Sequence, residues 1–217
     1  MSNGSWENIY INQGQVQIDV LDSVIDAAKV FKLRKCKNIL DLGCGTGRHT
    51  MYLSDQGFSL YACDISKKGL VLAKKNAKKV KNNGIKFSVQ DMYSMKYKNN
   101  TFDGVLCIWV QGHGFKDQVQ QGIDEIYRVL NPEGIVITDF VTIDDPTYGV
   151  GEQIALNTFI GGREGEENIP HYYTTKNELK EMFSKYSSID IQNKNYIFHD
   201  YKNTEHKIVS AIVTAIK

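Results

Sequence analysis

Short apolar runs alternate with amphipathic stretches along the chain up to residue 140. The runs are rich in branched and aromatic residues, which is typical of buried strands. They lie at residues 38–42, 60–64, 85–92, 101–110 and 134–140. Before and between them, apolar residues recur at the spacing of a helix. These helical stretches lie at residues 15–33, from 50 onward, 67–82 and 115–130. Strands that alternate with helices predict an α/β fold around a mostly parallel sheet.

The alternation breaks down at residues 141–173, which are rich in glycine and aromatic residues. A loop of this length in a compact domain is usually functional or disordered, and its apolar content favours an ordered substrate lid. We expect one short helix in it, near residues 152–159. A helix at 175–185 and two β runs at 189–199 and 207–216 then predict a terminal antiparallel hairpin, closed by a polar turn. We interpret the chain as one domain that consists of an N-terminal arm and helix, a core, the lid, and a C-terminal helix and hairpin. These parts are residues 1–32, 33–140, 141–173 and 174–217.

The first apolar run leads into a turn with glycine at alternate positions, Gly43, Gly45 and Gly47. Glycine lets the backbone approach a ligand closely and adopt positive φ, and the helix that follows presents free N–H groups at the same place. Dinucleotide enzymes favour a different spacing, G-x-G-x-x-G. Asp41, which precedes the turn, would repel a pyrophosphate but would accept a cationic amino-acid group. The turn therefore predicts a nucleotide-type ligand that carries a cationic group.

Two further predicted strands also end in an acid, Asp64 and Asp91. A carboxylate at the end of the second parallel strand can accept hydrogen bonds from both hydroxyls of a ribose. Asp64 can equally cap the helix that follows Ser66, and the two roles do not exclude each other. The glycine turn with these acids resembles the first motifs of the class I S-adenosylmethionine-dependent methyltransferases.

The family resemblance implies the fold. Its members have a Rossmann-like, seven-stranded, mostly parallel sheet with helices on both faces and a C-terminal antiparallel hairpin. The Gly45-Thr46-Gly47-Arg48-His49 signature and the short length are most similar to the small bacterial methyltransferases of the tellurite-resistance and ubiquinone-biosynthesis-like groups. Those proteins act on small molecules, so a small-molecule methyl acceptor is expected.

The resemblance also implies a cofactor, S-adenosyl-L-methionine, with S-adenosyl-L-homocysteine as product. Asp41 is implied to lie near the methionine ammonium, Asp64 to hold the ribose, and Asp91 with Met92 to hold the adenine. An aromatic N-terminal arm with Tyr10 either closes over the cofactor or packs on the sheet. The implied cofactor-binding residues are Asp41, Gly43, Cys44, Gly45, Gly47, Asp64, Ile65, Asp91, Met92, Ile108 and Tyr10.

Methyl transfer from a sulfonium needs little catalytic machinery because the cofactor is already activated. Open α/β sheets bind ligands beyond the carboxyl ends of their strands, so the residues after the fourth strand are the first candidates for chemistry. Among them, His113 is the preferred general base, and a loop histidine that contacts backbone is the alternative. His171 and Tyr172 in the lid are the next candidates.

Net charge, apolar run length and cysteine spacing limit which binding partners and which cellular compartment are expected. The formal net charge is +1, which is not the basic footprint of a nucleic-acid-binding domain. The lysines around residues 67–82 are interpreted as a solvated helix face. No apolar run is long enough for a membrane span, and the N-terminus does not resemble a signal peptide, so a cytoplasmic monomer or homodimer is expected. The four cysteines are widely spaced, which favours reduced thiols and no metal site.

Two other functions remain open at this stage. One is a non-catalytic protein that binds S-adenosylmethionine, which only a turnover assay separates from an enzyme. The other is a nicotinamide-dependent oxidoreductase, which the glycine spacing and Asp41 disfavour.

Overall fold

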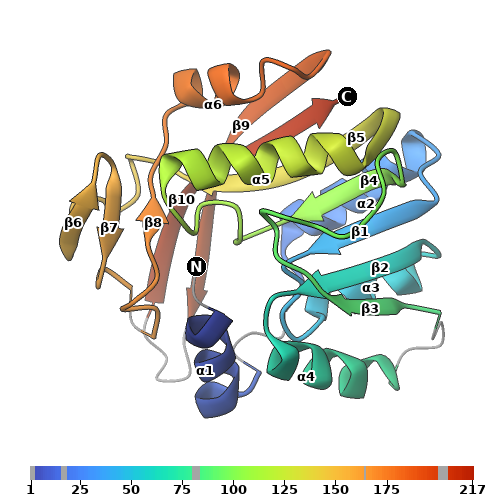
Figure 1. The fold of residues 1–217 in the computed structure, drawn as a ribbon, viewed down its shortest axis with the longest axis horizontal. Helices are drawn as coiled ribbons and strands as arrows, with labels where there is room; N and C mark the ends of the chain where they lie inside the picture. The colour runs from blue at the N-terminus through green and yellow to red at the C-terminus, as the bar shows by residue number, and fades with distance from the viewer. Residues whose placement is uncertain (1–2, 16–18, 80–83, 164, 200–204) are drawn as a thin grey trace.

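The computed structural model describes residues 3–15, 19–79, 84–163, 165–199 and 205–217. Within this part of the chain, seven strands form one sheet in the order β3-β2-β1-β4-β5-β10-β9 (Figure 1). Strands β1 to β5 run parallel, whereas β10 is antiparallel to both β5 and β9. This confirms the seven-stranded, mostly parallel sheet and its C-terminal antiparallel hairpin.

The strands of this sheet are β1 (Asn38–Leu42), β2 (Ser59–Asp64), β3 (Lys86–Val89), β4 (Phe102–Cys107), β5 (Leu130–Val141), β9 (Ser188–His199) and β10 (Glu205–Ile216). The helices are α1 (Asn3–Gln13), α2 (Asp22–Leu33), α3 (Arg48–Asp55), α4 (Lys67–Ala77), α5 (Lys116–Val129) and α6 (Lys176–Met182). A second, small sheet consists of β6 (Glu152–Ala155), β7 (Thr158–Ile160) and β8 (His171–Tyr172). None of these helices is long and apolar enough to cross a membrane, as judged over the described residues.

The apolar strands are buried because helices cover both faces of the sheet. On one face, α5 and α6 pack on strand residues such as Leu40 and Val105. On the other, α2 and α3 pack on residues such as Ile39 and Leu106. Neighbouring residues of a strand point to opposite faces, so Ile39 and Leu40 belong to different cores. Gly104 lets α2 lie close to the sheet, since a Cβ there would come within 2.8 Å of the Phe31 ring.

The N-terminal region differs from the sequence-based prediction. Residues 3–13 form a helix, α1, where we expected an aromatic arm, and the helix expected at 15–33 begins only at Asp22. Residues 16–18, in the first part of that stretch, and most of the polar turn at 202–205 lie outside the described residues.

The helix expected near residues 152–159 is wrong, because β6 and β7 form a hairpin there. Asn157 has φ of 52°, a left-handed conformation that asparagine tolerates in tight turns. The ring of Phe159 in β7 packs edge-on against Tyr148 and Tyr173. These contacts with distant residues stabilise the hairpin, and the local apolar spacing does not indicate them.

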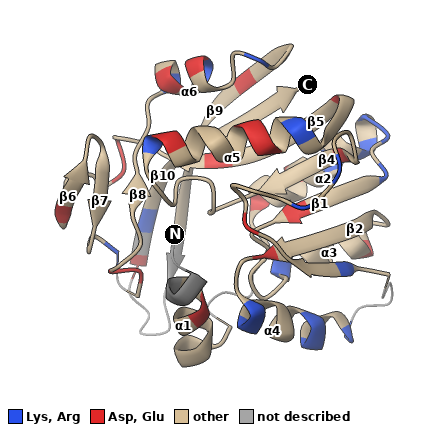
Figure 2. Cartoon of the chain, in the orientation of Figure 1, with Lys and Arg blue, Asp and Glu red and all other residues tan. Residues whose placement is uncertain are grey.

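The predicted solvated face of α4 is present. Its lysines are largely exposed, and they appear as the blue segments along α4 in Figure 2.

Candidate active site

A cavity of about 220 Å³ lies beyond the carboxyl ends of β1, β2 and β4. The glycine turn after β1, the ends of the neighbouring strands and α1 all line it. This is the position at which open α/β sheets bind ligands.

The glycine turn is tied to the neighbouring strand by its backbone. The amides of Gly43 and Cys44 both donate to the carbonyl oxygen of Cys63, at 2.8 and 2.9 Å. Gly43 has φ of 74°, and a Cβ there would lie 2.4 Å from a methyl group of Val110. Glycine is therefore required at this position both by its backbone conformation and by the close side chain.

Asp64 is held at the end of β2 by two backbone donors. Its two carboxylate oxygens accept hydrogen bonds from the amides of Gly45 and Ser66, each at 2.8 Å. The side chain is buried, and burial raises the pKa of this carboxyl group above its ordinary value. Each carboxylate oxygen keeps a further lone pair, and Asp64 lines the cavity. The carboxylate is thus oriented in advance as a hydrogen-bond acceptor for a ligand.

Most of the predicted cofactor-binding residues meet around this cavity. Those that line it are Tyr10, Gly43, Cys44, Gly45, Asp64, Ile65, Asp91, Met92 and Ile108. They come from five separate segments, and the parallel order of the strands brings them to one edge of the sheet.

Asp41 and Gly47 lie outside the cavity lining. Asp41 shares a face of β1 with Ile39 and points to α3, where its carboxylate accepts a hydrogen bond from the hydroxyl of Thr50 at 2.5 Å. Burial raises its pKa to about 6. Gly47 is the left-handed residue from which α3 begins. Asp41 and Gly47 therefore connect the glycine turn to α3, on the side away from the cavity.

Helix α1 is the main feature that the sequence-based prediction missed. Trp6, Ile9, Tyr10 and Gln13 line the cavity, and they follow the i, i+3, i+4, i+7 spacing of one helix face. This spacing was the available signal, although the segment is otherwise polar. The Tyr10 hydroxyl lies over the turn, 2.5 Å from where a Cβ of residue 45 would be.

One carboxylate fastens α1 to α4. Oε2 of Glu7 accepts hydrogen bonds from the Ser66 hydroxyl, at 2.5 Å, and from the Lys68 amide, at 3.0 Å. The Ser66 hydroxyl in turn accepts from the amide of Gly69, as an N-cap does. An acid at the N-terminus of a helix is favoured by the free amides and by the helix dipole.

The three residues predicted to be catalytic do not all reach the cavity. His113 lines it, and its ring packs against Trp6, with ring centroids 4.9 Å apart. His171 lies behind His113, with a centroid distance of 5.0 Å. Tyr172 is buried outside the lining and donates its hydroxyl to Glu178 at 2.8 Å. The Tyr172 side chain therefore contacts α6 and not the cavity.

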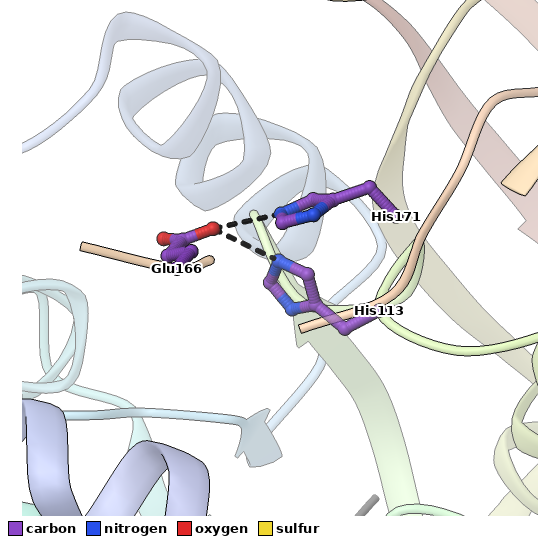
Figure 3. Close-up of side chains that lie close together, drawn as sticks. All are labelled: His113, Glu166 and His171. Carbon is purple, nitrogen blue, oxygen red and sulfur yellow. Dashed lines mark hydrogen bonds and ion pairs between the residues drawn. The ribbon is translucent and has the colours of Figure 1, made fainter. Parts of the chain in front are cut away.

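A third residue, Glu166, joins the two histidines (Figure 3). Its Oε2 atom lies 2.7 Å from Nε2 of His171 and 3.9 Å from Nε2 of His113. Burial, with a smaller contribution from His171, lowers the pKa of His113 to about 3. A base of this pKa is weak at neutral pH. Glu166 lines the cavity and was not among the residues predicted from the sequence.

Comparison with known proteins shows that the chain is similar to methyltransferases. Residues 40–138 match the methyltransferase domain family. The putative methyltransferase YqeM of Bacillus subtilis (strain 168) is 34% identical over 143 residues, which cover 65% of this chain and 56% of that protein. The ubiquinone biosynthesis O-methyltransferase of Rickettsia akari (strain Hartford) is 30% identical over 158 residues, covering 72% and 59%. The chain thus spans less than two thirds of the length of both relatives.

Solved structures share the fold. A S-adenosylmethionine-dependent methyltransferase of Methanosarcina mazei superposes with a TM-score of 0.69 at 20% identity, covering 83% of this chain and 92% of that one. The magnesium protoporphyrin IX methyltransferase of Synechocystis PCC 6803, solved with bound S-adenosylhomocysteine, has a TM-score of 0.64 at 19% identity, covering 98% and 93%. At these identities the likeness establishes the fold alone.

Proposed function

We propose that the chain is a class I S-adenosylmethionine-dependent methyltransferase, as its fold and the match of residues 40–138 to a methyltransferase domain support, and that it transfers the methyl group of S-adenosyl-L-methionine to a small-molecule acceptor. The observation that carries the proposal is Asp64. Its carboxylate lines the cavity, and two backbone amides hold it at the end of β2.

We assign the two ends of the cavity to the two substrates. The nucleoside lies at the end formed by Asp64 and Asp91, the acids after β2 and β3, with Met92 against the adenine. The acceptor lies at the opposite end, beside His113 and Glu166. The path between them passes over the glycine turn, which has no side chains to obstruct the methionine portion.

Two observations favour a small acceptor. Helix α1 lines the cavity, which is about 220 Å³, and the formal net charge of +1 provides no footprint for nucleic acid. Gly165 and Glu166, from the segment 141–173, line the acceptor end. We therefore propose that this segment acts as the substrate lid.

The reaction is an in-line displacement in which positioning supplies most of the protein's contribution. Holding an acceptor against the sulfonium methyl group removes an entropic barrier that is worth about 7–11 kcal/mol in the best-oriented intramolecular reactions. A protein-derived triad is not required for this chemistry.

Calorimetric titration with S-adenosyl-L-homocysteine tests the proposal. We expect micromolar binding to the wild type and a loss of affinity of about 100-fold or more in Asp64→Ala, because hydrogen bonds to a charged group are lost. Asp103→Ala is the matched control. Asp103 also accepts two backbone amides, those of Lys37 and Asn38, each at 2.9 Å, but at the opposite edge of the sheet.

Asp103→Ala should lower the free energy of unfolding and leave the affinity for S-adenosylhomocysteine unchanged. Binding that Asp64→Ala leaves unchanged would contradict the assignment of the ribose. A folded wild type that binds the nicotinamide cofactor but not S-adenosylhomocysteine would favour the oxidoreductase alternative. Cofactor binding without turnover of any acceptor in a broad screen would favour a non-catalytic binding protein.

A further inference from the structure

Three titratable side chains converge where the loop after β4 meets the segment between β7 and β8. His113 comes from that loop, Glu166 comes from the segment, and His171 is the first residue of β8; all three point toward one another (Figure 3). One ligand atom from each lies within 4.8 Å of the other two. We propose that this His–Glu–His cluster binds a divalent transition-metal ion such as Zn²⁺.

The dimensions of the cluster are close to those of a metal site. Zn²⁺ binds imidazole nitrogens and carboxylate oxygens at about 2.0–2.2 Å, so two ligand atoms in a tetrahedral site lie roughly 3.4 Å apart. The distances from Oε2 of Glu166 to the two Nε2 atoms, 2.7 and 3.9 Å, fall on either side of this value. A displacement of the carboxylate by less than about 1 Å brings both near it. Two histidines and one glutamate are also the ligand set of catalytic zinc sites that keep an open position.

The hydrogen bonds of His171 require a positive charge between this ring and the carboxylate. Its Nδ1 atom lies 2.9 Å from the carbonyl oxygen of Ile169. A carbonyl oxygen only accepts, so Nδ1 carries a proton, and Nε2 of the neutral ring has a bare lone pair. That lone pair faces a carboxylate oxygen at 2.7 Å. Either a second proton or a metal ion must lie between these two acceptors.

Two features favour the metal ion over the proton. The Nδ1–H of His171 is anchored to a backbone carbonyl, which is how metal-bound histidines are usually oriented. In addition, a proton would satisfy His171 and Glu166 alone, whereas a metal ion uses all three side chains. The ring of His113 is held in place between Trp6 and His171, and its Nε2 points to the same oxygen.

The position of the cluster in the cavity indicates the chemical class of the methyl acceptor, and this inference rests on the proposed function. His113 and Glu166 line the acceptor end of the cavity, so an open coordination position would face the acceptor. A hydroxyl group that binds the ion releases its proton to solvent more readily. Its oxygen then attacks the methyl carbon, the carbon–sulfur electron pair returns to sulfur, and the products are a methyl ether and S-adenosylhomocysteine. The acceptor is thus a hydroxylated molecule that coordinates the ion through oxygen.

The test uses Co²⁺ as a spectroscopic probe on the chelator-treated, full-length protein. Co²⁺ takes the same N/O sites as Zn²⁺, and ligation by imidazole and carboxylate produces visible d–d absorption. We expect the absorption to saturate at one equivalent and to disappear when Zn²⁺ is added. In Glu166→Gln and in His171→Gln the affinity should fall about 100-fold or more, since even supporting residues around a metal cost 10–100-fold.

Glu167→Gln is the matched control, because Glu167 is an exposed neighbouring glutamate that accepts a backbone bond from Gly165. Its Co²⁺ affinity should equal that of the wild type. Absence of saturable absorption in the folded wild type overturns the metal site and leaves an imidazolium–carboxylate pair between loop and lid. Equal loss in Glu167→Gln and Glu166→Gln overturns it as well.

Titration of the same samples with S-adenosylhomocysteine separates the two proposals. Cofactor binding without Co²⁺ binding refutes the metal site and leaves the proposed function intact. Co²⁺ binding without cofactor binding supports the metal site and refutes methyl transfer as its purpose.

Discussion

At the scale of single residues, Asp139 in β5 shows how burial makes the pH dependence of stability predictable. One carboxylate oxygen accepts a hydrogen bond from the Trp109 amide at 2.7 Å, and within the described residues the other has no hydrogen-bond partner. Burial raises the pKa of this carboxyl group to about 7, whereas in the unfolded chain it is near 3.9.

We therefore predict that Asp139→Asn stabilises the protein increasingly as pH rises from about 4 to 7. Below this window both states are protonated and the wild-type side chain imposes no charge penalty. Within it the unfolded wild type ionises first, so the wild type loses up to about 4 kcal/mol of stability relative to the variant. Urea unfolding of both proteins at several pH values measures the difference. A flat difference for Asp139→Asn would mean that the pKa of this carboxyl group is the same in the folded and the unfolded protein.

At the scale of elements, α1 lines the cavity with its apolar face, and among the described residues a small number of polar contacts attach it to the rest of the protein. Glu7 connects it to the N-terminus of α4 through Ser66 and Lys68, and Tyr10 places its hydroxyl on the glycine turn. Because α1 lines the cavity beside the glycine turn, we expect that opening of α1 affects the entry and release of a ligand.

We predict that Glu7→Ala loosens α1 without unfolding the sheet. Amide hydrogen exchange should become faster in residues 3–13, and S-adenosylhomocysteine should dissociate about tenfold faster, which corresponds to one hydrogen bond to a charged group. Stopped-flow displacement and exchange mass spectrometry measure the two effects. Glu152→Ala, an exposed acid in β6, should change neither. Unchanged dissociation in Glu7→Ala would show that α1 does not gate the cavity.

At the scale of the whole molecule, the cavity joins α1, both halves of the parallel sheet and the segment before β8. A ligand that binds only the folded protein adds its binding free energy to the free energy of unfolding. This coupling makes thermal unfolding a measure of site occupancy.

We predict that S-adenosylhomocysteine at 100 times its dissociation constant raises the melting temperature by roughly 5–10 °C, because about 2.7 kcal/mol is gained and each kcal/mol shifts a chain of this size by about 2–4 °C. Differential scanning calorimetry measures the shift. At the same ligand concentration the melting temperature of Asp64→Ala should rise by no more than about 1–2 °C. A wild type that shows no shift at saturating ligand would exclude the cavity as the cofactor site.

The sequence by itself determined the core of the fold and much of the cavity lining. Strand periodicity, the glycine turn and the acids Asp64 and Asp91 are encoded by adjacent residues, because local backbone geometry and alternating burial depend on near neighbours. The parallel order then brings the strand ends to one edge. Side chains two positions apart on a strand point to the same face, so Asp41 lies on the same face of β1 as Ile39, which is the face that α3 covers.

Only the tertiary structure decided what surrounds that core. Helix α1 and the β6–β7 hairpin are stabilised by contacts with distant segments, such as Glu7 with α4 and Phe159 with Tyr173, which override weak local preferences. The His–Glu–His cluster consists of residues 113, 166 and 171. The sequence-based expectation about a metal site rests only on the spacing of the four cysteines, which do not belong to this cluster. The side chains of the loop after β4, of the segment before β8 and of β8 meet through packing between distant parts of the chain, and no local sequence pattern indicates which of them will converge.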